Sequence, residues 1–166
     1  MSKACLSRLR PSNFLLAAAL VLGMSACAGT PTLYDYLTIA PAETQVWNDF
    51  MPGSKPSSNA VLRLSVTNAS ESDVTLSDPE MIITNAPDAR ALRRFPAVVL
   101  VADQRVRKVT IPAKSTVEIT FRSPDYGLQP IDTERSPRAR LAIRMNSSLD
   151  LPLLFRSPIV DIFKTQ

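Results

Sequence analysis

Residues 60–67, AVLRLSVT, decide the fold class, because apolar and polar side chains alternate along them. Leu62, Leu64 and Val66 fall on one side of an extended chain, and Arg63 falls on the other. A period of two is typical of a β-strand with one buried and one solvated face. We therefore predict a strand here, with Leu64 in the core.

The flanking sequence continues as short β-rich runs broken by turn residues. These runs cover residues 74–76, 81–83, 97–102, 109–111, 116–121, 139–145, 151–155 and 158–163. Pro79 should end the strand that begins at Val74, since proline cannot donate to a ladder. The run 97–102 is apolar on both faces, which predicts a central strand, and residues 109–121, VTIPAKSTVEITF, predict a hairpin.

These runs predict an all-β domain over residues 34–166. We expect a single antiparallel β-sandwich, immunoglobulin-like, with about seven to nine strands. Fourteen prolines against four glycines suit this class, since proline marks strand edges and turns. One alternative stays open: Asp88 is a candidate N-cap for a helix over residues 89–95, ARALRRF.

The first residues have the layout of an export signal. A basic leader with Lys3, Arg8 and Arg10 precedes the apolar run 14–22, FLLAAALVL. This run is too short to cross a bilayer, which needs about 20 residues, but it matches the centre of a secretory signal peptide. We predict that residues 1–26 are removed.

The sequence Met24-Ser25-Ala26-Cys27 resembles the lipobox of bacterial lipoproteins. The resemblance implies that Cys27 receives a diacylglyceryl group and becomes the first mature residue, with its amine acylated. Residues 27–33 would then form a short tether. Ala28 stands where aspartate commonly signals inner-membrane retention, so the expected location is the cell envelope, anchored by lipid to the outer membrane and facing the periplasm.

Cleavage changes the charge balance. The full chain has 19 basic and 15 acidic residues, and loss of the three basic residues of the leader lowers the net charge from +4 to +1. A near-neutral domain gives no general electrostatic footprint for nucleic acid, so no nucleic-acid partner is expected. The expected partners are membrane lipid, through acylated Cys27, and another envelope protein.

The residue types that most enzymes and metal sites use are scarce. The chain has no histidine, which excludes a Ser-His-Asp triad and a histidine-based zinc site. Of its two cysteines, Cys5 lies in the leader and Cys27 would be a thioether, so no disulfide is expected. We therefore expect no catalytic residues, no metal ligands and no cofactor.

Two groups of residues are candidates for recognition. The first is a basic cluster that could bind phosphates or carboxylates, or could simply be a solvated strand end. It comprises Arg90, Arg93, Arg94, Arg105, Arg107 and Lys108. The second is a recognition loop containing Trp47, Phe50 and Met51, although a lone tryptophan is more often a core residue.

The layout LRLSVTNASESDVTLSDP, residues 62–79, followed by later hairpins, is similar to exported cupredoxin-like and immunoglobulin-like domains, including periplasmic copper chaperones. Those chaperones bind Cu(I) through methionine and histidine, which are ligands soft enough for it. This chain lacks histidine, and Met51, Met81 and Met145 fall on different predicted elements. The leading hypothesis is therefore a non-catalytic envelope lipoprotein with a protein-binding or assembly role; the alternative is a periplasmic ligand or copper carrier.

Overall fold

The computed structural model describes residues 30–53 and 55–165, and the predictions for residues 1–26 and Cys27 lie outside them. After a 3-10 turn at Leu33–Asp35 (η1), ten strands follow. They are β1 Leu37–Asp49, β2 Ser57–Asn68, β3 Val74–Asn85, β4 Ala91–Pro96, β5 Val98–Val101, β6 Gln104–Val106, β7 Lys108–Ile111, β8 Thr116–Arg122, β9 Arg138–Ser147 and β10 Leu153–Thr165. No helix of this described part is long and apolar enough to span a membrane.

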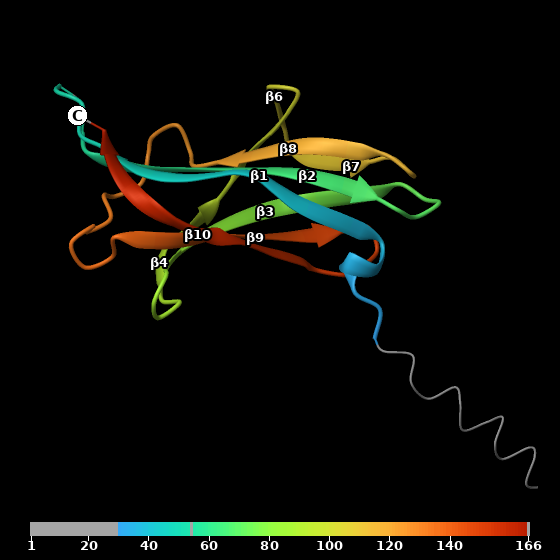
Figure 1. Ribbon diagram of the computed structural model, residues 1–166. Coiled ribbons are helices and arrows are strands. Elements are labelled where there is room, and N and C mark those ends of the chain that lie inside the picture. Colours follow the sequence, from blue (N-terminus) through green and yellow to red (C-terminus); the bar gives the residue numbers. More distant parts are fainter. Residues whose placement is uncertain (1–29, 54, 166) are drawn as a thin grey trace, which may run out of the picture. The chain divides into compact units, whose positions relative to one another are not determined.

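All ten strands belong to one sheet, which curls so that two layers face each other (Figure 1). Layer A contains β1, β2, β8, β5 and β6; layer B contains β3, β4, β7, β9 and β10. The long strand β10 joins the layers, since its first part pairs with β9 and its end pairs with β1. The sandwich-like all-β prediction is thus confirmed.

The core lies between the layers and uses the side chains that the alternation predicts. In β2, Leu62, Leu64 and Val66 are completely buried, whereas Arg63 is exposed. A single apolar cluster runs from Leu33 to Ile162. Residues Thr32–Gln166 form one compact unit that contains this whole cluster, so the segment has the core it needs to fold alone.

Two predicted strand ends differ in the structure. Strand β3 does not stop at Pro79: it continues through a bulge at Asp78 and Pro79, where Asp78 has a φ of 53°. The predicted hairpin 109–121 is also wrong, because β7 pairs with β3 in layer B while β8 pairs with β2 in layer A. The connection between them therefore crosses from one layer to the other.

The sheet is mixed, because β1 and β10 run parallel. Strand β1 was not predicted: Pro41 and the register shift between Pro41 and Glu43 hide its alternation. The predicted runs 151–155 and 158–163 are one strand, β10, with a register shift between Arg156 and Ile159. The run 97–102 forms β5, which lies next to the edge strand β6 and not at the sheet centre.

The helix considered after Asp88 is absent, and residues 91–96 form β4 instead. The Asp88 carboxylate accepts a hydrogen bond from the Arg90 backbone N–H at 3.0 Å, and this bond is the main cause that lowers the pKa of Asp88. Asp88 thus closes a turn before the strand. Phe95 then points into the core opposite Met81 of β3, a packing contact between layer-B strands that local sequence does not reveal.

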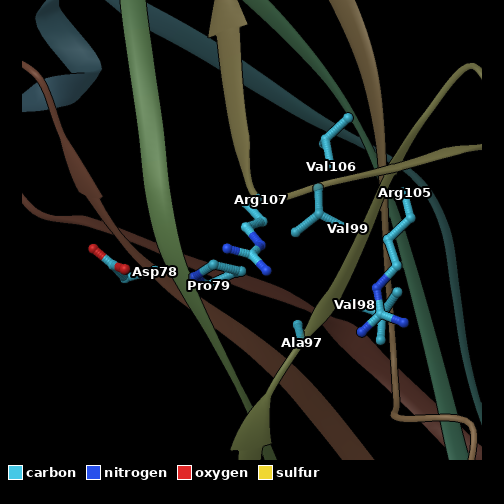
Figure 2. A pocket seen from close by; sticks show the side chains of 8 residues that line it. All are labelled: Asp78, Pro79, Ala97, Val98, Val99, Arg105, Val106 and Arg107. Carbon is cyan, nitrogen blue, oxygen red and sulfur yellow. The ribbon is translucent and has the colours of Figure 1, made fainter.

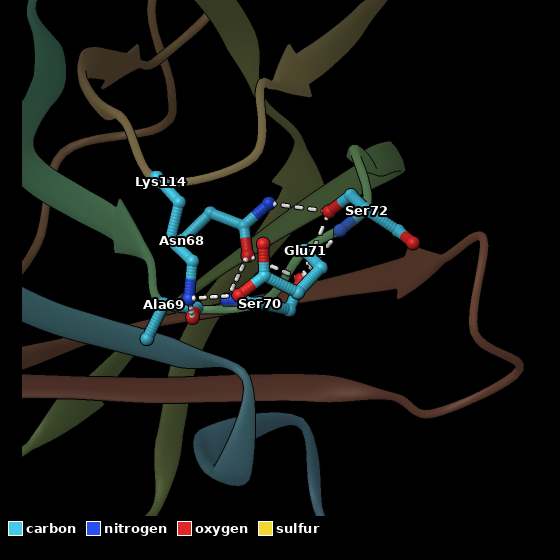
Figure 3. Close-up of polar contacts among 6 residues, drawn as sticks. All are labelled: Asn68, Ala69, Ser70, Glu71, Ser72 and Lys114. Carbon is cyan, nitrogen blue, oxygen red and sulfur yellow. Dashed lines mark hydrogen bonds and ion pairs between the residues drawn. The ribbon is translucent and has the colours of Figure 1, made fainter.

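The polar connector after β2 is held by Asn68, which is completely buried (Figure 3). Its Nδ2 donates to the carbonyls of Ser72 and Ile111, at 2.8 and 3.0 Å, and its Oδ1 accepts from the N–H and hydroxyl of Ser70, at 3.0 and 2.7 Å. Lys114 donates to the Ala69 carbonyl at 2.7 Å. One side chain therefore fastens the β2–β3 corner to the end of β7.

Candidate functional site: a pocket where the layers meet

Strand β3 pairs with β9 along one edge. Along its other edge it pairs with β4 and with β7, and a short segment between these two strands has no ladder partner. Strand β4 pairs with Glu80–Thr84, and β7 pairs with Val74–Ser77. Asp78 and Pro79 lie between these two segments, at the bulge. Pro79 has no N–H to offer a neighbouring strand, so the hydrogen-bond ladder along β3 is interrupted there. At the same point the chain passes from the end of β4 to β5 in layer A.

A pocket of about 530 Å³ lies at this interruption, and we call it the seam pocket. The chain crosses from layer B to layer A through Ala97, forms the β5–β6 hairpin, and returns through Arg107 to β7. The Ala97 N–H donates to the Pro79 carbonyl at 2.9 Å, which fixes one side of the opening. The pocket is lined by Asp78, Pro79, Ala97, Val98, Val99, Arg105, Val106 and Arg107 (Figure 2).

The seam pocket combines an apolar wall with two guanidinium groups. Val98 and Val99 are almost fully buried and form the wall. Figure 2 shows the Arg107 side chain pointing toward Pro79. Arg105 is paired at 4.0 Å with Asp125, but both side chains are about 70% exposed; such a pair is weak and can exchange for another anion. The arrangement suits a carboxylate or phosphate carried next to a small apolar group.

Asp78 is the one acidic side chain of the pocket lining, and it is already engaged. Its Oδ2 accepts hydrogen bonds from the Ser77 hydroxyl at 2.9 Å and from Asn146 Nδ2 at 3.2 Å. These contacts stay within layer B, on β3 and β9. The carboxylate therefore helps to hold the bulge and leaves the two arginines to meet a ligand.

The structure brings only part of the predicted basic cluster together. Arg105 and Arg107 share the seam pocket. Arg94 pairs with Glu80 at 3.7 Å on another face of layer B. Arg93 donates to the carbonyls of Gln129 and Pro130, at 3.0 and 2.8 Å, and so anchors a loop.

The two remaining members of the cluster lie at different points along β3. Arg90 is exposed in the turn before β4, whereas Lys108 begins β7 opposite Ser77. The structure therefore gathers Arg105 and Arg107 in one pocket, and it gives Arg93 and Arg94 partners elsewhere.

The predicted recognition loop is also divided. Trp47 is neither a core residue nor a loop residue: it lies near the end of β1 and stacks on Phe163 of β10, with ring centroids 6.1 Å apart. Phe50 and Met51 follow the strand and are 40% and 53% exposed. Trp47 instead stabilises the outer surface of the parallel β1–β10 pair.

The three methionines in the described part of the chain do not form a surface cluster. Met81 and Met145 are buried on the neighbouring strands β3 and β9, and Met51 is exposed after β1. Within residues 30–53 and 55–165, no three histidine, cysteine, aspartate or glutamate side chains are placed to hold a metal ion.

Sequence reasoning missed six lining residues of the seam pocket, which are Asp78, Pro79, Ala97, Val98, Val99 and Val106. The Asp-Pro pair does signal an interrupted ladder, but the sequence does not show which distant segment faces the interruption.

No family model matches this chain, and comparison with curated proteins finds no match. Solved structures resemble it distantly. Structural genomics target SoR45 has 12% identity and a TM-score of 0.46, over 80% of this chain and 89% of that one. The copper-bound PCuAC domain from PmoF2 has 12% identity and a TM-score of 0.39, over 78% and 94%. The putative ApaA protein from Bordetella pertussis has 14% identity and a TM-score of 0.38, over 75% and 89%.

Proposed function

We propose that this chain is a lipid-anchored, non-catalytic binding module of the cell envelope, which engages an anionic, partly apolar segment of a partner protein at the seam pocket. The observation that carries the proposal is that Arg105 and Arg107 both line a cavity with valine walls. A carboxylate accepts charge-assisted hydrogen bonds from a guanidinium group, and the valines offer an apolar surface beside that contact.

The edge strand beside the pocket supports the same proposal. Strand β6 ends the sheet and pairs only with β5 within the described part of the chain. Its backbone can therefore accept an extended segment by strand addition, in which main-chain hydrogen bonds provide affinity and neighbouring pockets provide specificity. Gln104 is exposed on this strand.

Site-specific crosslinking in the native envelope tests the binding site. A photoreactive residue at position 104 should give one reproducible protein adduct, and Arg105→Glu with Arg107→Glu should reduce that adduct at least tenfold. Two reversed charges remove both donors to the anion and repel it. The same photoreactive residue at position 134, which lines a separate hollow, is the matched control and should give no such adduct. Equal adducts with and without the arginines would refute the seam pocket as the binding site.

The lipid anchor has its own test. We expect Cys27→Ser to abolish membrane anchoring, because a hydroxyl cannot replace the thiol as acceptor of the diacylglyceryl group. Mass spectrometry should find acyl chains and a start at residue 27 in the native protein, and neither in the variant. An unacylated native chain with residues 1–26 intact would contradict the anchor. Two or three acyl chains suffice for stable attachment.

A further inference from the structure

A second cationic surface lies on the outward side of layer B, where four arginines are interspersed with aliphatic side chains. We call it the arginine face. Cross-strand pairing arranges it in three rows: Glu80, Arg144 and Leu154; Arg94, Ile82, Ala142 and Arg156; and Thr84, Arg140 and Ile159. The residues between them on each strand, such as Met81 and Ile143, point into the core.

The charge of this face is not balanced. Glu80 is the one carboxylate of the three rows, and it pairs with Arg94. In the described ranges, Arg140, Arg144 and Arg156 have no carboxylate within 4.0 Å. Arg140 is partly buried, and its Nε has no hydrogen-bond partner in this part of the chain. The two exposed guanidinium groups, of Arg144 and Arg156, are thus available to external anions.

The arginine face is also partly apolar. A hollow of about 430 Å³ lies over Ile82, Ala142 and Leu154, with Arg144 and Arg156 among its lining residues. Leu154 and Ile159 are 45% and 44% exposed. Guanidinium groups pair with phosphate oxygens, and exposed aliphatic side chains favour the boundary between headgroups and acyl chains. The mixture fits an anionic lipid surface.

The N-terminal turn attaches to the same strand. The Tyr34 hydroxyl donates to the Leu154 carbonyl at 2.6 Å, and burial raises the pKa of Tyr34. Thr32, which caps this turn, is five residues after Cys27. Five extended residues span at most about 18 Å, so lipid on Cys27 would keep the face close to headgroups and at high effective concentration.

We infer that the arginine face docks on the anionic headgroups of the membrane that holds Cys27, which fixes the orientation of the tethered domain. This inference rests on the anchor of the proposed function and is independent of the seam pocket. The charge and the short tether favour a lipid surface over an acidic protein. Each basic residue close to an anionic leaflet strengthens binding about fivefold.

Co-sedimentation of the folded segment 32–166 with vesicles tests the face without help from an acyl chain. Vesicles of phosphatidylcholine mixed with phosphatidylglycerol should bind the segment, and added salt should release it. Vesicles of phosphatidylcholine alone should bind it at least tenfold more weakly. Arg144→Ser with Arg156→Ser should weaken binding to the mixed vesicles about twenty-five-fold, because two contributions of about fivefold are lost.

The matched control removes the same charge elsewhere: Arg105→Ser with Arg107→Ser should retain vesicle binding within about twofold. No binding to mixed vesicles, equal binding to both vesicle types, or equal losses in the two double variants would overturn the inference, the first outcome leaving an acidic protein as the occupant. Crosslinking from position 104 should survive Arg144→Ser with Arg156→Ser, so failure of the lipid surface and failure of the seam pocket are separable.

Discussion

Leu64→Ala is expected to lower the free energy of unfolding by about 2–5 kcal/mol. Leu64 is completely buried in β2, between Pro41 of β1 and Ile119 of β8. Removal of its isobutyl group leaves a cavity in the core that a sheet paired on both sides cannot easily close. Denaturant unfolding of the segment 32–166, followed by circular dichroism, gives the value.

Ser65→Ala is the matched control, since Ser65 is the next residue of the same strand and faces the other way. It should change the stability by no more than about 0.5 kcal/mol. A loss below about 0.5 kcal/mol for Leu64→Ala would mean that the buried face of β2 is the opposite one, and the layer arrangement would have to be abandoned.

Asn68→Ala should cost about 2–4 kcal/mol, although the substitution removes no apolar group. The side chain makes four hydrogen bonds at a fully buried position. Its loss leaves the Ile111 carbonyl without the amide and releases Ser70, and each buried polar group without a partner costs about 1–3 kcal/mol. The measurement is again denaturant unfolding.

Asn68→Asp separates the hydrogen bonds that Asn68 donates from those that it accepts. A carboxylate still accepts from Ser70 but cannot donate to Ser72 or Ile111. We expect it to be as harmful as alanine or worse, since it sets a charge against the Ile111 carbonyl. Asn146→Ala, on an exposed asparagine with a single 3.2 Å bond to Asp78, is the control and should cost under about 0.5 kcal/mol. Equal losses at positions 68 and 146 would show that the corner is not a structural anchor.

Strand identity could be predicted where burial is one-sided. The inward series Leu141, Ile143 and Met145 in β9 was predicted from alternation and is buried in the structure. Strand β1 escaped prediction because Pro41 shifts its register. Alternation reports which face of a strand is buried, but it depends on an uninterrupted register.

Pairing partners were harder to predict than strands. Residues 109–121 have the same alternation whether β7 and β8 form a hairpin or lie in different layers, because both arrangements bury Ile111 and Ile119. The two arrangements differ in whether β7 pairs with β3, a strand about thirty residues earlier in the chain. Local sequence carries no signal for that contact.

In the candidate sites too, local features could be predicted from the sequence and long-range contacts could not. A count of basic residues along the chain joined Arg90 to Lys108, but Arg90 lies beside Asn85 and Lys108 beside Ser77, at different points of β3. The arginine face, in contrast, was present in the sequence as the polar half of RARLAIRM, residues 138–145, with Arg140 and Arg144 on the side away from the core. Attention to the outward residues of a predicted strand, and not only to the inward ones, would have found it.

The parallel pairing of β1 with β10 has a consequence for biogenesis. The first and last strands of the domain are hydrogen-bonded neighbours, and contacts between such distant segments form late and slowly. Closure of the sheet therefore has to wait until the carboxyl-terminal residues are available. If the chain is exported from its amino end, as proposed, it therefore stays incompletely folded, and so transportable, until β10 has been synthesised.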